Sequence, residues 1–337
     1  MNEALVGHLF PPKAAFPPPS RLTLWDKPPL LTQEEIAHAL SKSSALSAPG
    51  PHGIPYLTWK RVNTINPSIL LHMLSPLVSL EYHPASLNVA KGVVFDKPGK
   101  PSDKSPTSLT IIVLLRTVSK ILERIIGPRF HLAARSRGLI HLNQCCSLPG
   151  LRTYDACLPL VNDVKAFQRR RLEVSSVFLD IKASFDNVDN LTLARILTEG
   201  GVPLYLVSWV TTCQGERNRT LVFQSALGTP APVNLGAPEG SPVSPLLFVI
   251  YVAPLHFRIP RGLMFSYMDN FPLMTTHLCY RGNIRQLQRL FRTIQAWAGS
   301  LGISFSIRKK GTHTLENTLP KPLAVVSLAH SARRGDL

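Results

Sequence analysis

The spacing of apolar residues predicts two long amphipathic helices and one buried helix. Apolar positions recur at every third or fourth residue from Val118 to Ile126, and Gly127–Pro128 is expected to end that helix. The same period runs from Ile284 to Leu301. Residues 245–255 are apolar on every side, so that helix is expected to be buried.

Two shorter helices are predicted from their end signals. Thr32 and Glu35 form a capping-box pattern, which places the start of one helix at this point. A second helix is expected over residues 190–197, and Gly200–Gly201 would stop it.

Runs rich in β-branched and aromatic residues predict strands between these helices. The predicted strands are residues 93–95, 109–115, 174–181, 221–223, 231–235 and 263–268. The fourth and fifth are expected to pair as a hairpin, and the third and sixth each lead into an aspartate, Asp180 and Asp269. Because helices and strands alternate irregularly, the fold class predicted is α+β.

The N-terminal segment differs from the rest of the chain. Residues 1–30 contain seven prolines, which predicts an extended lead-in that is no part of a packed core. No internal repeat is visible along the remaining sequence.

The charge of the chain favours a polyanionic partner. It has 37 Lys and Arg against 20 Asp and Glu, a net charge of 37 − 20 = +17. With 45% hydrophobic residues it can bury a core, which excludes wholesale disorder. Nucleic acid is a better fit than a membrane surface, and a basic protein without such a partner is the alternative.

The cysteines and the apolar stretches indicate a soluble intracellular protein, in the nucleus or the cytoplasm. The five cysteines include no Cys-x-x-Cys spacing, so they are read as reduced thiols. The N-terminus lacks the pattern of a signal peptide. The most apolar stretch, residues 246–257, is broken by Pro254 and is too short to cross a bilayer, so no membrane partner is expected.

Asp180 and Asp269 are the main candidates for chemistry. A carboxylate at the end of a buried strand is costly to desolvate without a counter-charge. Two of them on strands that lie side by side would suggest a shared divalent cation such as Mg²⁺, which serves phosphoryl transfer. The alternative is that each aspartate only caps the turn or helix that follows it.

Several segments, taken in chain order, resemble the reverse transcriptase of non-LTR (LINE-like) retrotransposons. Residues 178–188 resemble its first catalytic motif, F/L-D-I-K-G-A-F-D-x-V. Those at 236–255, 265–270 and 302–309 resemble its G-x-P-Q-G-S-P segment, its Y-x-D-D box and its fourth palm motif. Upstream, residues 49–55 and 97–125 follow its fingers pattern. The resemblance covers residues 32–313.

The resemblance implies a right-hand polymerase with fingers and palm and no thumb. In this interpretation residues 1–31 are the Pro-rich lead-in, 32–170 the fingers, 171–313 the palm and 314–337 a tail. The implied partners are an RNA template, a DNA primer and dNTP. A full-length element would supply the missing thumb and endonuclease.

The same resemblance assigns catalytic and metal-binding residues. Asp180 and Asp269 would bind two ions, Mg²⁺ or Mn²⁺, with Asn270 as a further ligand. A primer 3′-hydroxyl would then attack the α-phosphate of the dNTP. Lys309 would approach the triphosphate, and a plain surface lysine is the alternative.

Further residues are expected to contact the nucleotide and the nucleic acid. Phe185 would be the steric gate against a ribose 2′-hydroxyl, and an ordinary core phenylalanine is the alternative. The other nucleotide-binding candidates are Glu239, Gly240, Ser241, Lys97 and Lys100. The nucleic-acid-binding candidates are Lys104, Arg285 and Arg289, and a solvated helix face would explain the two arginines equally well.

The sequence departs from the family pattern at functional positions. Asn270 stands where the Y-x-D-D box has its second aspartate, and losing that charge should cost about 3 kcal/mol, a hundredfold in rate. Glu239 replaces a glutamine, Thr110 and Leu148 replace arginines, and Lys310–Gly311 replaces Thr-Glu.

These departures lead to three readings of the chain. The first is an RNA-directed DNA polymerase domain whose activity is impaired. The second is a catalytically inactive remnant that still binds nucleic acid through its basic surface. The third is a product that folds poorly and has no function.

Overall fold

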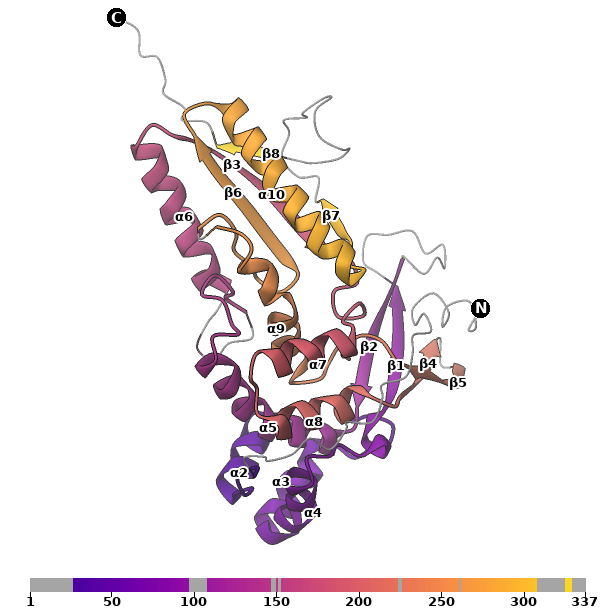
Figure 1. Cartoon of the computed structure of the whole chain (residues 1–337). Coiled ribbons are helices and arrows are strands. Elements are labelled where there is room, and N and C mark those ends of the chain that lie inside the picture. Colours follow the sequence, from indigo (N-terminus) through magenta and orange to yellow (C-terminus); the bar gives the residue numbers. More distant parts are fainter. Residues whose placement is uncertain are drawn as a thin grey trace, which may run out of the picture. The chain divides into compact units, whose positions relative to one another are not determined.

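The computed structural model consists of two compact units of an α+β protein (Figure 1). One unit contains Met1–Gly138 and Phe185–Leu247, and the other contains Leu139–Ser184 and Phe248–Leu337. The residues that the structure describes are 27–96, 108–146, 150, 153–223, 226–260, 262–307 and 325–328.

Helices of the first unit include three that the sequence predicted. The helices of this unit are α2 (Gln33–Ser41), α3 (Tyr56–Ile65), α4 (Pro67–Ser79), η1 (Ala85–Asn88, 3-10), α5 (Thr117–Ser136), α7 (Asn190–Glu199) and α8 (Leu204–Gln214). The apolar period predicted α5, and end signals predicted α2 and α7. The prediction that Gly127–Pro128 ends the helix was wrong, because α5 continues through both residues. Ile126 and Phe130 on either side are buried, and their burial outweighs the one hydrogen bond that a proline removes.

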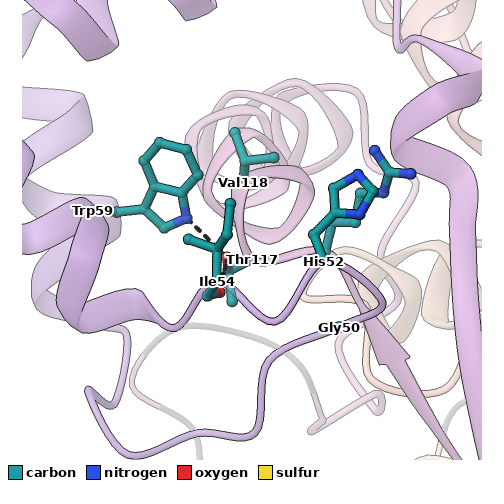
Figure 2. A pocket seen from close by; sticks show the side chains of 7 residues that line it. Gly50, His52, Ile54, Trp59, Thr117 and Val118 are labelled. Atoms are coloured by element: carbon teal, nitrogen blue, oxygen red, sulfur yellow. Dashed lines mark hydrogen bonds between the residues drawn. The ribbon is translucent and has the colours of Figure 1, made fainter.

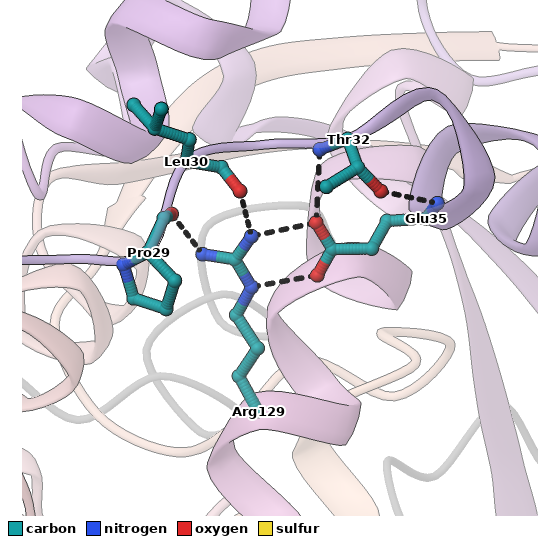
Figure 3. Close-up of polar contacts among 5 residues, drawn as sticks. All are labelled: Pro29, Leu30, Thr32, Glu35 and Arg129. Atoms are coloured by element: carbon teal, nitrogen blue, oxygen red, sulfur yellow. Dashed lines mark hydrogen bonds and ion pairs between the residues drawn. The ribbon is translucent and has the colours of Figure 1, made fainter.

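The predicted capping box at the start of α2 is confirmed, and it belongs to a larger polar contact (Figure 3). Glu35 receives two hydrogen bonds from the Arg129 guanidinium of α5, at 2.7 and 2.6 Å. The same guanidinium donates to the backbone oxygens of Pro29 (2.8 Å) and Leu30 (3.1 Å). Arg129 therefore ties the segment before α2 to α5.

The sheet of the first unit has the strand order β2-β1-β4-β5. Its strands are β1 (Val89–Asp96), β2 (Leu109–Leu115), β4 (Arg217–Phe223) and β5 (Ala226–Val233). The β1–β2 and β4–β5 pairs are antiparallel, whereas β1 and β4 run parallel. Four of the predicted strands, two of them forming the predicted hairpin, are thus confirmed. β2 has the predicted bounds, β1 and β4 are longer, and β5 begins and ends earlier than expected.

The second unit is built around the long strand β3 (Glu173–Ile181). β3 pairs antiparallel with β6 (Asn270–His277), β7 (Phe305–Ile307) and β8 (Val325–Leu328). The helices α6 (Thr153–Arg169) and α10 (Tyr280–Leu301) run alongside these strands (Figure 1). The predicted buried helix is α9 (Ser244–His256).

Alternating residues of β3 show that α6 and α10 cover opposite faces of the sheet. Val174 packs with Met274 of β6 and with apolar side chains of α6. The next residue, Ser175, accepts a 3.2 Å hydrogen bond from Asn283 of α10. Because successive side chains of a strand point to opposite faces, each helix shields one face of the sheet.

The strand predicted at residues 263–268 was wrong. Only isolated bridges form in this segment, at Met264, Ser266 and Tyr267, and the regular strand begins at Asn270. Asp269 therefore precedes a strand instead of ending one. The reason is that residues 267–270 make a tight turn, which an apolar run does not reveal.

Four helices were not predicted from the sequence: α3, α4, α6 and α8. Two of them contain an internal proline, Pro76 in α4 and Pro159 in α6, which argued against a helix. In α8 nearly every residue is buried, so its sequence has no amphipathic period. Among the described residues, no helix combines the length and apolarity that crossing a bilayer requires.

We expect Arg129→Met to lower the free energy of unfolding by about 1–3 kcal/mol, because a bidentate pair and two carbonyl contacts are lost. Burial raises the pKa of Glu35, but hydrogen bonds from Arg129 and the Thr32 N–H outweigh it, so the pKa lies below 4.5. The stability from Glu35 is therefore present at neutral pH and lost as the pH falls through that lowered pKa.

Urea denaturation of the variant at several pH values measures both effects. Arg195→Met is the matched control, since Arg195 pairs with Glu199 at 3.8 Å on an exposed helix face and should contribute little. Equal losses in the two variants would contradict the assignment.

Candidate active site

The register of β3 against β6 brings together the three residues that the sequence predicts as metal ligands, Asp180, Asp269 and Asn270. Asp180 lies directly opposite Asn270 in the antiparallel pair. Beyond this pair, the N–H of Ile181 donates to the backbone oxygen of Asp269 at 3.0 Å. Since opposed residues of an antiparallel pair project from the same face, the side chains of Asp180 and Asn270 are neighbours.

A tight turn holds Asp269 next to this pair. Tyr267 and Asn270 exchange two backbone hydrogen bonds, of 3.0 and 3.1 Å, so only Met268 and Asp269 form the turn between them. Met268 has φ +55°, a left-handed conformation that costs a side-chain-bearing residue about 1–2 kcal/mol. The turn is therefore strained, as turns at functional sites often are.

The amide of Asn270 is hydrogen-bonded to the neighbouring carboxylate. Its Nδ2 donates to Oδ1 of Asp269 at 2.9 Å. An aspartate at position 270 could not make this contact, because two carboxylates at that distance repel each other. Here the amide thus partly satisfies the carboxylate that a cation would otherwise neutralise.

Hard oxygen donors meet at this end of β3 and β6. Oδ1 of Asp180 is shielded from solvent, and Asp269 and Asn270 are half-buried. Carboxylate and amide oxygens are the ligands that Mg²⁺ prefers. The oxygens of Asp180, Asp269 and Asn270 therefore fit a hard divalent cation. Because Asn270 is uncharged, they provide one negative charge fewer than three acidic side chains would.

Phe185 lies in the first unit, against the loop that follows β5. Its backbone oxygen accepts a 2.7 Å hydrogen bond from Ala237. At Gly236, which has φ +83°, a Cβ would lie 2.7 Å from Cα of Asp186 and 2.8 Å from the oxygen of Phe185. Only glycine permits this approach, so Phe185 and the loop are held in close backbone contact.

The predicted nucleotide-binding residues of this loop differ in exposure. Glu239 and Gly240 are exposed, whereas Ser241 is buried. The Ser241 hydroxyl donates to Glu123 of α5 and accepts from the N–H groups of Val243 and Ser244, which start α9. Ser241 therefore fixes the loop between α5 and α9.

A buried arginine clamps the same loop, and the sequence interpretation missed it. Arg217 donates to the backbone oxygens of Gln214, Leu235 and Gly236. Burial lowers its pKa to about 10, so it stays charged at neutral pH. The Arg-x-Arg spacing at the start of β4, which puts Arg217 and Arg219 on one face, was the available signal.

The charges around Arg217 and Arg219 include two acidic residues. Burial raises the pKa of Asp186, while the charges of Arg219 and Arg217 act in the opposite direction. Burial lowers the pKa of Arg219, and Asp186 and Glu239 oppose that shift. The positive charge of Arg219 thus partly compensates the negative charge of Glu239 within the same unit.

The arginines of α10 lie on an exposed face of the second unit. Arg285 and Arg289 are both exposed, as are Arg281 and Arg292 on the same helix. The sequence of α10 contains no acidic residue. This face therefore has the charge and the exposure that contact with phosphate groups requires.

A small basic hollow lies in the first unit at the start of α5 (Figure 2). Its lining residues are Gly50, His52, Ile54, Trp59, Arg116, Thr117 and Val118. Trp59 donates to the hydroxyl of Thr117, which donates to the oxygen of Ile54, both at 2.8 Å. The lining includes two basic side chains, His52 and Arg116, and no acidic one. The sequence placed part of this lining in the fingers pattern but predicted no hollow here.

The remaining predicted site residues cannot be placed. Lys97, Lys100, Lys104 and Lys309 lie outside the described residues. Their roles stay predictions.

Comparison with known proteins agrees with these motifs. A family model for reverse transcriptase (RNA-dependent DNA polymerase) matches residues 97–319. The chain is 26% identical over 289 residues to a probable RNA-directed DNA polymerase from transposon BS of Drosophila melanogaster, covering 83% of this chain and 31% of that protein.

Two further relatives have a similar extent. A probable RNA-directed DNA polymerase from transposon X-element of Drosophila melanogaster is 24% identical over 297 residues, 86% of this chain and 32% of the relative. The RNA-directed DNA polymerase from mobile element jockey of Drosophila funebris is 24% identical over 304 residues, with the same two coverages. The chain spans about a third of the length of the curated relatives that it matches.

The contacts of Arg217 generate a prediction about stability. We expect Arg217→Met to lower the free energy of unfolding by about 3 kcal/mol, since three carbonyl oxygens and Asp186 lose a buried partner. Arg217→Lys keeps the charge but not the fork of donors, so it should lose less. Chemical denaturation measures both, and a methionine variant as stable as the parent would contradict the clamp.

Proposed function

Because the chain belongs to the reverse transcriptase (RNA-dependent DNA polymerase) family, we propose that it adds dNTPs to a primer on an RNA template, as the polymerase domain of a LINE-like retroelement. The observation that carries this proposal is the register of Asp180 opposite Asn270, beside Asp269. A primer 3′-hydroxyl would attack the α-phosphate, and pyrophosphate would leave.

Asp180 and Asp269 would hold two divalent cations in this reaction, with Asn270 beside them. The cations, when bound, activate the attacking oxygen and neutralise charge on the leaving group. The protein contributes the positions of the carboxylates. β3 holds Asp180 through its backbone hydrogen bonds, and the turn before β6 holds Asp269, so little freedom is lost when substrate binds.

The reaction would be impaired in this chain because of Asn270. The amide adds no charge, and its bond to Oδ1 of Asp269 occupies an oxygen that a cation would use. Both effects weaken cation binding. An activity well below that of a chain with aspartate at position 270 follows from this argument.

The other predicted residues keep their roles in the proposal. Phe185 would contact the sugar of the nucleotide, next to Glu239, Gly240 and Ser241 on the loop before α9. Lys97, Lys100 and Lys309 would contact its phosphates. Residues 32–170 would form the fingers and 171–313 the palm, with Lys104, Arg285 and Arg289 against the nucleic acid.

The alternative function is nucleic-acid binding without catalysis. It is supported by the exposed arginines of α10 and the absence of acidic residues from that helix. The net charge of +17 favours the same partner. The two functions differ in whether nucleotide is incorporated after the template–primer has bound.

We expect Asn270→Asp to raise primer extension on an RNA template about a hundredfold, because the lost charge returns. The measurement is incorporation of dNTP with Mg²⁺ or Mn²⁺. Asn270→Ala is the matched control, since it removes the hydrogen bond to Asp269 without adding charge and should give no gain.

A second control separates restored catalysis from a general change in structure. Asp180→Asn, introduced together with Asn270→Asp, should abolish the gain. If the folded Asn270→Asp variant extends no better than the parent, the account of impairment by Asn270 is wrong. No extension by any variant that binds template–primer would favour the alternative function.

Replacing both Arg285 and Arg289 by glutamine should weaken binding to a template–primer duplex and reduce its salt dependence. Two phosphate contacts contribute about 1.8 to the slope of log K against log salt. Arg195→Gln, an exposed arginine of α7, is the control and should leave the slope unchanged. An unchanged slope in the double variant would show that these arginines face solvent only.

A further inference from the structure

Three buried side chains of metal-ligand type meet in the first unit. His83, Glu123 and Cys213 each offer a donor atom, and these atoms all lie within 4.8 Å of one another. Their exposed fractions are only 1%, 2% and 4%. His83 precedes η1, Glu123 belongs to α5 and Cys213 to α8, so three separate elements converge on one point.

The contacts of His83 leave one ring nitrogen available. Its Nε2 lies 3.0 Å from the hydroxyl of Ser119, and its backbone N–H donates to Thr212 at 2.9 Å. Its ring meets Trp209 edge to face, with centroids 5.6 Å apart. Nδ1 is shielded from solvent and makes no hydrogen bond of normal geometry. Burial lowers the pKa of His83, although the nearby Asn88 side chain and Pro84 backbone act to raise it. A buried ring nitrogen without a partner is costly, and a metal ion is one way to satisfy it.

The carboxylate of Glu123 is oriented by hydroxyl groups. Ser119 donates to Oε1 at 3.1 Å, and Ser241 donates to Oε2. Ligands of bound metals are usually positioned by such outer hydrogen bonds. Cys213 is a free, buried thiol on the neighbouring helix.

We propose that His83, Glu123 and Cys213 bind a zinc ion that braces the first unit. Nitrogen, oxygen and sulfur donors together suit Zn²⁺, whereas Mg²⁺ and Ca²⁺ take oxygen ligands. Donor atoms around tetrahedral zinc lie about 3.5 Å apart, so shifts of about 1 Å would close the site. The described residues offer three ligands, so a solvent oxygen would take the fourth position.

The charges of such a site balance. A dication, one thiolate and one carboxylate sum to +2 − 1 − 1 = 0, which avoids burying a net charge. Burial lowers the pKa of His83 to about 4, so its imidazole is neutral and able to ligate. Burial raises the pKa of Cys213 and of Glu123. Zinc binding would therefore release the thiol proton to solvent.

The ion would connect elements that also hold the loop before α9. Glu123 already reaches that loop through Ser241, and Asn88, close after His83, donates to the oxygens of Thr212 and Gly215 at 2.9 Å. A ligand on each of three elements would link these elements through metal bonds. The ion is thus structural and adds to the proposed polymerase function without being required by it.

The test is the zinc content of the full chain, purified after zinc supplementation and without chelator. We expect about one zinc ion per chain, and less than about a tenth of that in Cys213→Ala. Cys279→Ala is the matched control, because the exposed Cys279 lies 3.5 Å from His277 and could hold zinc adventitiously. This control should keep its zinc.

Two measurements on the unaltered chain keep the proposal testable if Cys213→Ala does not fold. Cobalt in place of zinc should give a thiolate-to-metal absorption band, and chelation should lower the unfolding midpoint by several degrees. The proposal would be overturned if the folded chain took up neither zinc nor cobalt. It would also be overturned if Cys213→Ala kept its zinc while Cys279→Ala lost it. His83 and Glu123 would then be linked through Ser119, with the buried thiol of Cys213 beside them.

Discussion

The pairing of β3 with β6 is the constraint on which the candidate active site depends. Asp180 faces Asn270 only in this register, and a slip by one residue would turn every side chain of β6 to the other face. The register is stabilised from both sides, because Val174 and Met274 pack toward α6 while Ser175 bonds to α10. The apolar pairing along the strands thus determines where the polar ends meet.

Within that site, the chemistry is governed by the balance of charge. Two adjacent carboxylates need a cation, whereas Asp269 and Asn270 already satisfy each other through a 2.9 Å hydrogen bond. A site of this kind is stable without bound metal and has less to gain from binding it. In the proposed reaction, the amide of Asn270 would lower the catalytic power and would also lower the electrostatic cost of folding the metal-free chain.

Buried polar groups hold one loop of the first unit in place. The loop from Gly236 to Ser244 is held by Arg217 through backbone oxygens and by Glu123 through Ser241. A buried polar group costs free energy unless it has hydrogen-bond partners, and Arg217 and Ser241 have such partners here. Loops that approach a substrate need this kind of fixing, because their own side chains contribute little to a core.

The sequence by itself determined several helices and strands, α10 among them, and the family. The period of α10, the capping box of α2 and the motif order are local properties that need no knowledge of the fold. It did not reveal α8, whose apolar residues point in all directions, or the turn before β6, which interrupts an apolar run. Only the tertiary structure decided that Asp180 lies beside Asn270, that Arg217 clamps a loop and that His83, Glu123 and Cys213 meet. These arrangements depend on burial and on contacts between residues far apart in the chain, and neither can be read from the composition of the sequence or the spacing of its residues.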